Sequence, residues 1–154
     1  RLGRLFAGRR PNALCTSLDA LRRGQAVRVS DRLQGNPVHV GEVARVCMGI
    51  LDQMSVGADR HGVFHYCSLG ETGYMDFAEA AMACASQYAP LASASELLND
   101  VTDESRPLRN HTLDCSKIRR EFGIQQLPWR NFIERAVTRY LELYVEGEGV
   151  IEKS

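Results

Sequence analysis

The chain is short of lysine, of long apolar runs and of closely spaced cysteines, and each shortage excludes a class of protein. Lysine occurs only at Lys117 and Lys153, and the 19 basic and 19 acidic side chains among the 154 residues give a formal net charge of zero. A nucleic-acid-binding protein relies on clustered excess Lys and Arg facing phosphates, so no nucleic-acid partner is expected. No apolar run approaches the roughly 20 residues that span a membrane, so no membrane role is expected.

The cysteines and histidines do not form a disulfide or metal-binding pattern. No C-x-x-C pair occurs among the five cysteines, which favours a reducing, cytoplasmic compartment over a disulfide framework or a zinc site. Among the histidines, only His61 and His65 approach a ligand-like spacing. Neither an H-E-x-x-H pattern nor an acidic third ligand accompanies them, so no metal site is predicted.

Two motifs of nucleotide-cofactor enzymes are also absent. The sequence contains no G-x-x-G-x-x-G or G-x-G-x-x-G turn, and the nearest candidate, Gly70–Gly73, is better interpreted as a loop before a helix. Neither lysine has a tyrosine four residues before it, so the Tyr-x-x-x-Lys pair that supplies a general acid is missing. No catalytic residue is therefore assigned to this chain, and the residues that bind a cofactor are left open.

Short apolar strands alternate with amphipathic helices along the sequence, and Gly, Pro or small polar residues mark the boundaries. This order predicts an α/β fold. The apolar stripes around Val43, Phe77 and Phe132 are expected to form the core, and the stripe that includes Val43 must pack on a sheet or another helix. Strands are expected at residues 2–6, 26–29 and 62–67. Helices are expected after Pro11, where Leu14, Leu18 and Leu21 have helical spacing, and from Val40. Further helices are expected after Thr72 as N-cap, from Asp114 to Phe122 with Gly123 ending the helix, and from Pro128.

The segment Ser105–Lys117 has an unusual composition for a loop, with two arginines, a proline and several polar residues. Arg106 comes directly before Pro107, whose ring restricts the local backbone. The planar fork of an arginine is suited to paired phosphate oxygens. Arg106 is therefore a candidate phosphate ligand, and the alternative is a surface arginine in an incidental ion pair.

Several segments occur in an order and spacing that carry a family resemblance. They are Arg1–Phe6, Asn12, Val29–Val40, Gly62–Tyr66, Arg106–Lys117 and the helix after Pro128. Together, from Arg1 to about Leu143, they resemble the carboxy-terminal half of the extended short-chain dehydrogenase/reductases, closest to the dTDP-4-dehydrorhamnose reductase group. The expected fold is the corresponding portion of a Rossmann-type α/β enzyme.

The resemblance implies a function as well as a fold. Enzymes of this family bind NAD(P) on an amino-terminal Rossmann sheet and hold a nucleotide-diphosphate sugar mainly with the smaller carboxy-terminal part. Residues 1–144 would be that substrate-binding half and 145–154 a flexible tail, with the missing amino-terminal half as partner and NAD(P)H as its cofactor. The reaction implied is hydride transfer to a 4-keto-6-deoxy nucleotide sugar. By matching position, Arg106 would contact the diphosphate, with Asn12 and Arg4 at neighbouring substrate-side positions.

Some positions depart from the family pattern, and other interpretations remain. Leu33 and Val38 stand where the family has Gln and Thr, and Arg4 stands where it has Trp, so another nucleotide sugar is left open.

The segment Arg106–Lys117 is also similar to the non-catalytic regulatory beta subunit of methionine adenosyltransferase. Another extended reductase or epimerase and a stand-alone interaction domain are further alternatives. Apolar helix faces on an isolated half are expected to drive a homodimer or to require the missing half.

Overall fold

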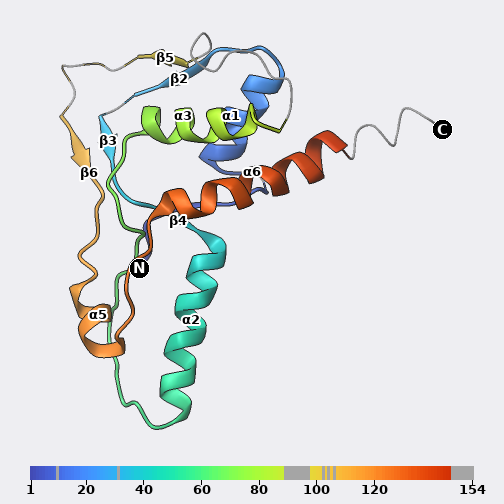
Figure 1. The fold of residues 1–154 in the computed structure, drawn as a ribbon. Helices are drawn as coiled ribbons and strands as arrows, with labels where there is room; N and C mark the ends of the chain where they lie inside the picture. The colour runs from blue at the N-terminus through green and yellow to red at the C-terminus, as the bar shows by residue number, and fades with distance from the viewer. Residues whose placement is uncertain are drawn as a thin grey trace.

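The computed structural model describes residues 1–9, 11–30, 32–88, 98–101, 103, 105 and 107–146. Strands and helices alternate along these ranges, which confirms the α/β prediction (Figure 1). In chain order the elements are β1 Arg4–Phe6, α1 Ala13–Arg22, β2 Val27–Val29, β3 Leu33–Gln34, β4 Pro37–His39, α2 Val40–Ser55, α3 Tyr74–Ala85, β5 Leu98–Asp100, β6 Arg109–Asn110, α5 Ser116–Phe122, the 3-10 turn η1 Trp129–Phe132, α6 Ile133–Leu141 and the π-helical turn η2 Glu142–Glu146.

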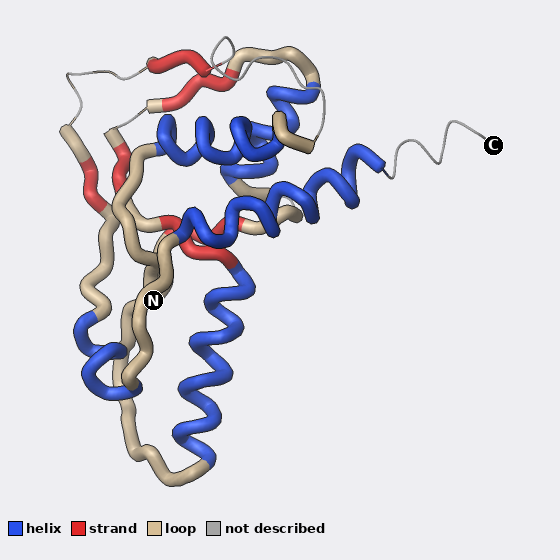
Figure 2. The backbone as a smooth tube through the Cα atoms, viewed as in Figure 1, coloured by secondary structure: helices blue, strands red, loops and turns tan. Residues whose placement is uncertain are grey.

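The strands form three separate parallel pairs, β1 with β4, β2 with β5, and β3 with β6 (Figure 2). Parallel strands cannot be joined by a tight hairpin, so a longer connection separates the two members of each pair. The β3–β6 register sets Leu33 opposite Arg109. Residues far apart in the sequence are therefore brought to one place, and this matters for the site described below.

The main core lies between α1, α3 and α6, which Figure 1 shows in the upper part of the molecule beneath β2 and β5. Each helix contributes the apolar stripe that its spacing predicts. Asn12 begins α1, because its side chain accepts a hydrogen bond from Cys15 N at 3.3 Å. The buried side chains of this core include Leu14, Leu18, Leu21, Phe77, Met82, Ala136, Val137 and Tyr140.

A second cluster joins β4, α2 and α5 below the main core (Figure 1). Its buried members are Val38, Val46, Tyr66, Cys67, Cys115, Ile118, Phe122 and Ile124. Helix α5 ends where predicted, since Gly123 has a φ of 65° and closes the helix in the left-handed conformation. This cluster is the smaller of the two, and it anchors only part of α2.

The apolar stripe of α2 was expected to contribute to the core, but only part of it is covered within the described ranges. Val46 is buried and Val43 and Ile50 are half-buried, but four other members of the stripe are exposed. The short α5 meets only one side of α2, so nothing in the described ranges covers the remainder. The exposed members are Ala44, Cys47, Leu51 and Met54.

Two other boundaries differ from expectation. Residues 62–67 do not form a strand, because only a single bridge joins Leu2 to Tyr66 and no ladder extends from it. The last helix opens with η1 before α6 begins at Ile133. The expected tail begins inside η2, which extends to Glu146, and residues 147–154 lie outside the described part of the chain.

Candidate functional site

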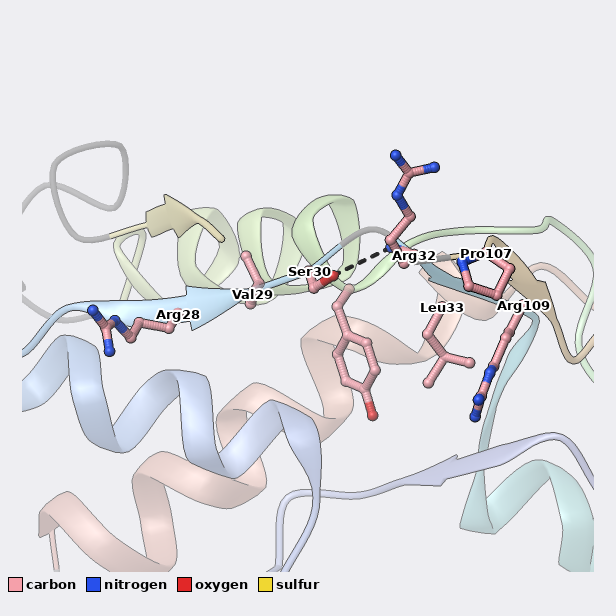
Figure 3. Close-up of a pocket in the computed structure, with 8 residues that line it drawn as sticks. Arg28, Val29, Ser30, Arg32, Leu33, Pro107 and Arg109 are labelled. Atoms are coloured by element: carbon pink, nitrogen blue, oxygen red, sulfur yellow. Dashed lines mark hydrogen bonds between the residues drawn. The ribbon is translucent and has the colours of Figure 1, made fainter. Parts of the chain in front are cut away.

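A cavity of about 620 Å³ lies where β2, β3, β6 and the start of α3 meet (Figure 3). This volume is within the range of small-molecule sites in proteins, which are roughly 300–1,000 Å³. Figure 3 shows Leu33 and Arg109 extending to one side of the strands and Arg32 to the other. The lining residues are Arg28, Val29, Ser30, Arg32, Leu33, Tyr74, Pro107 and Arg109.

The local structure explains why arginines reach this cavity. Val27 and Val29 of β2 are buried, so Arg28 between them projects to the exposed side of the strand. The backbone N–H of Arg109 donates to the carbonyl of Arg32 at 2.8 Å, which extends the β3–β6 pairing and holds these two residues together. The arginines therefore come from two separate segments of the chain.

The charged side chains that line the cavity are all positive. Three arginines line it, and none of its lining residues in the described ranges is acidic. The Nε atom of Arg32 is buried and has no hydrogen-bond acceptor within the part of the chain that the structure describes. A buried donor without an acceptor costs free energy, so an anionic ligand that supplied one would be stabilised here.

A second cavity of about 410 Å³ adjoins the first, because both are lined by Leu33 and Tyr74. Arg4 and His111 are its polar side chains. The guanidinium carbon of Arg4 lies 3.7 Å from the centroid of the Tyr74 ring, a cation–π contact that holds Arg4 at the junction. The two cavities together offer several arginine side chains and a shared wall formed by Tyr74 and Leu33.

The three residues predicted from the sequence have different places. Arg4 lines the second cavity. Asn12 lines neither cavity, because its Nδ2 donates to Ala7 O at 2.9 Å and Arg9 O at 2.7 Å while its oxygen begins α1. Arg106 lies outside the described residues, and its neighbour Pro107 lines the first cavity. The substrate role of each of the three stays a prediction.

Sequence reasoning missed Arg28, Arg32, Arg109 and Tyr74. Arg109 lies in the same segment as Arg106, so the unusual composition there was a usable signal. The alternation around Arg28 marked it as an exposed strand residue without indicating a partner. No local signal pointed to Tyr74, since the first residue of a helix has no special pattern by itself.

The glycines of the Gly70–Gly73 turn do not form a cradle for a dinucleotide cofactor. Gly70 has a φ of 94°, and a Cβ placed on it would meet Trp129 Nε1 at 3.3 Å. The Gly70–Gly73 turn therefore packs against a tryptophan rather than leaving room for a pyrophosphate. Gly73 instead begins α3 as its N-cap, in place of the expected Thr72. The residues of this turn therefore do not fit NAD(P).

The described ranges also contain neither a metal-binding cluster nor a helix that could span a membrane. No group of three or more His, Cys, Asp or Glu side chains there could hold a metal ion. His61 instead lies 2.7 Å from Asp59 in an exposed pair. No helix in those ranges has the length and apolar character to cross a membrane.

Comparison with known proteins places this geometry in a family. A curated dTDP-4-dehydrorhamnose reductase from Aggregatibacter actinomycetemcomitans is 30% identical over 112 residues, which are 69% of this chain and 37% of that protein. The solved dTDP-4-dehydrorhamnose reductase of Clostridium acetobutylicum matches with a TM-score of 0.69 and 16% identity, over 90% of this chain and 46% of that one. The Bordetella bronchiseptica enzyme WbmG, solved with NAD and UDP, matches with a TM-score of 0.69 and 18% identity, over 94% and 44%.

The two solved structures share the Rossmann-type fold of extended short-chain dehydrogenase/reductases with this chain, which confirms the expected fold class. The chain spans about a third of the length of the curated relative and under half of the two solved proteins. The family model described as the RmlD substrate binding domain matches residues 1–142. The chain therefore belongs to the RmlD substrate binding domain family.

Proposed function

We propose that this chain is the sugar-nucleotide-binding half of an NAD(P)-dependent reductase that acts on a 4-keto-6-deoxy nucleotide sugar. The observation that carries the proposal is the first cavity, of about 620 Å³, whose described lining includes three arginines and no acidic side chain. The family membership and the curated reductase relative support the same conclusion. They favour it over the regulatory-subunit interpretation, which concerned only Arg106–Lys117.

The proposed substrate is complementary to the two cavities. Its diphosphate carries two negative charges, which Arg109 would neutralise through charge-assisted hydrogen bonds, while Arg28 and Arg32 would add to the positive potential around the cavity. Arg106 would join them, because it directly precedes the cavity residue Pro107. Arg4 would contact the substrate in the second cavity, against the Tyr74 ring.

Asn12 would act indirectly as a positioning residue. Its hydrogen bonds to Ala7 O and Arg9 O hold the loop after β1, the strand that carries Arg4. The reductant would be NAD(P)H, which supplies a hydride when bound to the amino-terminal half. This chain's residues would orient the sugar and neutralise its diphosphate, and they would not catalyse by themselves.

We also propose that residues 1–144 form one functional unit whose exposed α2 face meets the amino-terminal half. Met48, Leu51 and Met54 form a patch of large apolar side chains on this face. The solved reductase relative is more than twice as long as the match, so a companion segment of suitable size is implied. A second copy of this chain is the competing occupant.

Calorimetric titration of dTDP and dTDP-glucose tests the proposed function. We expect saturable binding, with dTDP binding more tightly than dTMP because the second phosphate adds charge-assisted contacts. Arg109→Gln should weaken dTDP binding by about tenfold, the effect of losing one such contact. Arg106→Gln and Arg4→Gln should each weaken binding of the sugar nucleotide.

Arg60→Gln is the matched control, since Arg60 is exposed and lines neither cavity. It removes the same charge and should leave the affinity for dTDP within twofold. Equal weakening by Arg60→Gln and Arg109→Gln would mean that the chain attracts anions only through its general charge. Absence of dTDP binding to the folded chain would contradict the proposal.

A further inference from the structure

A separate cavity of about 430 Å³ lies where α2 begins, between the loop after β1 and one side of α6. It shares no lining residue with the two cavities of the proposed substrate site. Figure 1 shows α2 starting directly after β4 near α6. Its lining residues are Ala7, Gly8, Arg9, His39, Val40, Gly41, Arg135, Thr138, Arg139 and Glu142.

The side chains around this cavity carry an excess of positive charge. Arg9, Arg135 and Arg139 contribute three guanidinium groups from two separate parts of the chain. Glu142 is the one acidic lining residue in the described ranges, and it already pairs with Arg139 at 2.8 Å. Arg9 and Arg135 therefore have no carboxylate partner among the described lining residues, and their two charges match that of a phosphate dianion.

Arg135 lies beside the start of α2. Its Nη1 atom is 3.9 Å from the position of a Cβ on Gly41, in the first turn of α2. The start of a helix carries a partial positive charge and unpaired backbone N–H groups, so a cation beside it is destabilising. Arg135 forms no ion pair within the described part of the chain. An anion bound between Arg135 and the start of α2 would attract both the guanidinium group and the positive end of the helix.

His39 provides a second, independent indication of a ligand. The residue is only 6% exposed, and its ring lies between Phe6 and Phe132, with centroids 5.3 and 5.4 Å away. Its Nδ1 accepts a hydrogen bond from Gly41 N at 3.1 Å, so the neutral ring carries its proton on Nε2. That Nε2–H has no acceptor within the described ranges, although His39 lines the cavity. The Nε2 atom is not among the buried atoms that lack a hydrogen-bond partner, so this donor is open to the cavity and available to an acceptor bound there.

The walls of the cavity are held rigidly. A Cβ on Gly8 would come within 2.3 Å of Ala136 O and 2.8 Å of Tyr140 N, so the loop after β1 lies directly on the backbone of α6. His39 is the last residue of β4 and also the N-cap of α2, which fixes the helix start against that loop. The cationic groups are therefore attached to a fixed frame rather than to a mobile segment.

From these observations we propose that this cavity is a binding site for a phosphate group. The group would be held by Arg135, Arg9, the His39 Nε2–H and backbone N–H groups of the first turn of α2 other than that of Gly41, which already donates to His39 Nδ1. Free phosphate and a phosphate monoester of a small metabolite both present the phosphate group that this site would bind. The site is separate from the proposed sugar-nucleotide site, so an experiment can contradict either proposal without affecting the other.

Nuclear magnetic resonance titration of the chain with inorganic phosphate, at constant ionic strength, tests the proposal. We expect saturable shifts of the Gly41 amide and of the His39 ring. Burial lowers the pKa of His39 and the charge of Arg135 lowers it further, whereas Glu42 on α2 acts in the opposite direction. Bound phosphate would offset Arg135, so the pKa of His39 should rise in its presence.

Two variants and a second ligand make the test more specific. Arg135→Gln should weaken phosphate binding by about tenfold, whereas the exposed control Arg60→Gln should not change it. Neither variant should alter dTDP binding to the first cavity. Tighter binding of glycerol 3-phosphate than of inorganic phosphate would assign the site to a phosphorylated metabolite, and the reverse order to the free ion. Shifts that do not saturate, or equal weakening by both variants, would overturn the proposal.

Discussion

At the scale of single residues, Glu42 is the most consequential buried charge in the described ranges. It is 1% exposed, receives hydrogen bonds from Arg45 Nε at 2.8 Å and Nη2 at 2.7 Å, and accepts another from the Tyr66 hydroxyl. Burial by itself would raise the pKa of Glu42, but the hydrogen bonds from Arg45 and Tyr66 outweigh burial and lower it. The carboxylate therefore joins the start of α2 to the chain around Tyr66.

Replacing this carboxylate should destabilise the protein in a pH-dependent way. We expect Glu42→Gln to lower the free energy of unfolding by about 2 kcal/mol at pH 7, a modest value because Arg45 is half-exposed. Since the folded pKa of Glu42 is below its ordinary value, the stabilisation is present above that ordinary value and is lost as the pH falls through the folded one. Urea unfolding at pH 7 and below pH 4 measures the difference.

The control for this experiment is Glu79→Gln, which removes an exposed carboxylate from α3. Its effect on unfolding should stay within about 0.5 kcal/mol, as for other surface substitutions. A Glu42→Gln difference that did not shrink at low pH would mean that packing, and not charge, holds this residue in place.

At the scale of elements, two glycines test how closely the loop after β1 lies on α6. Gly8→Ala would place a methyl group 2.3 Å from Ala136 O, and the helix backbone cannot yield easily. We expect a loss of about 2–3 kcal/mol in the free energy of unfolding. Gly49→Ala lies inside α2, where the nearest atom to the new methyl group is 4.0 Å away. That variant should gain about 0.5–1 kcal/mol through helix propensity.

Chemical denaturation of both variants measures these opposite effects. The contrast matters because each substitution adds the same methyl group. A Gly8→Ala protein as stable as the parent would show that the loop and α6 can separate, and it would weaken the rigid frame proposed for the phosphate site.

At the scale of the whole molecule, the exposed α2 face is expected to control association. Leu51 is 57% exposed in the middle of this face, with Met48 and Met54 nearby. Sedimentation equilibrium of the isolated chain should reveal self-association, and Leu51→Glu should shift it toward monomer because a charge would be buried in the contact. Addition of the amino-terminal half should displace the second copy.

Val63→Glu serves as the matched control for this measurement. Val63 is also 57% exposed, but it lies outside α2. Its substitution should leave association unchanged. A strictly monomeric chain that unfolds cooperatively and does not bind the amino-terminal half would contradict the proposed role of the α2 face.

The prediction of elements from the sequence succeeded where the signal was local. The spacing of Leu14, Leu18 and Leu21 identified α1, and Gly123 identified the end of α5. It failed at residues 62–67, because strand formation depends on a partner that the segment does not contain. It overestimated the burial of α2, because periodicity says which side of a helix is apolar and not whether anything in the chain covers it.

The same limit applies to the candidate site, because local sequence patterns predict only part of it and contacts between distant segments decide the rest. The sequence by itself determined that the chain is an α/β protein with arginine as its main cation and without a glycine-rich cofactor turn. Only the tertiary structure decided that Arg28, Arg32 and Arg109 line one cavity, because the parallel pairing of β3 with β6 joins segments far apart in the chain. The approach of Arg135 to the start of α2 is likewise a result of helix packing, which no local pattern encodes.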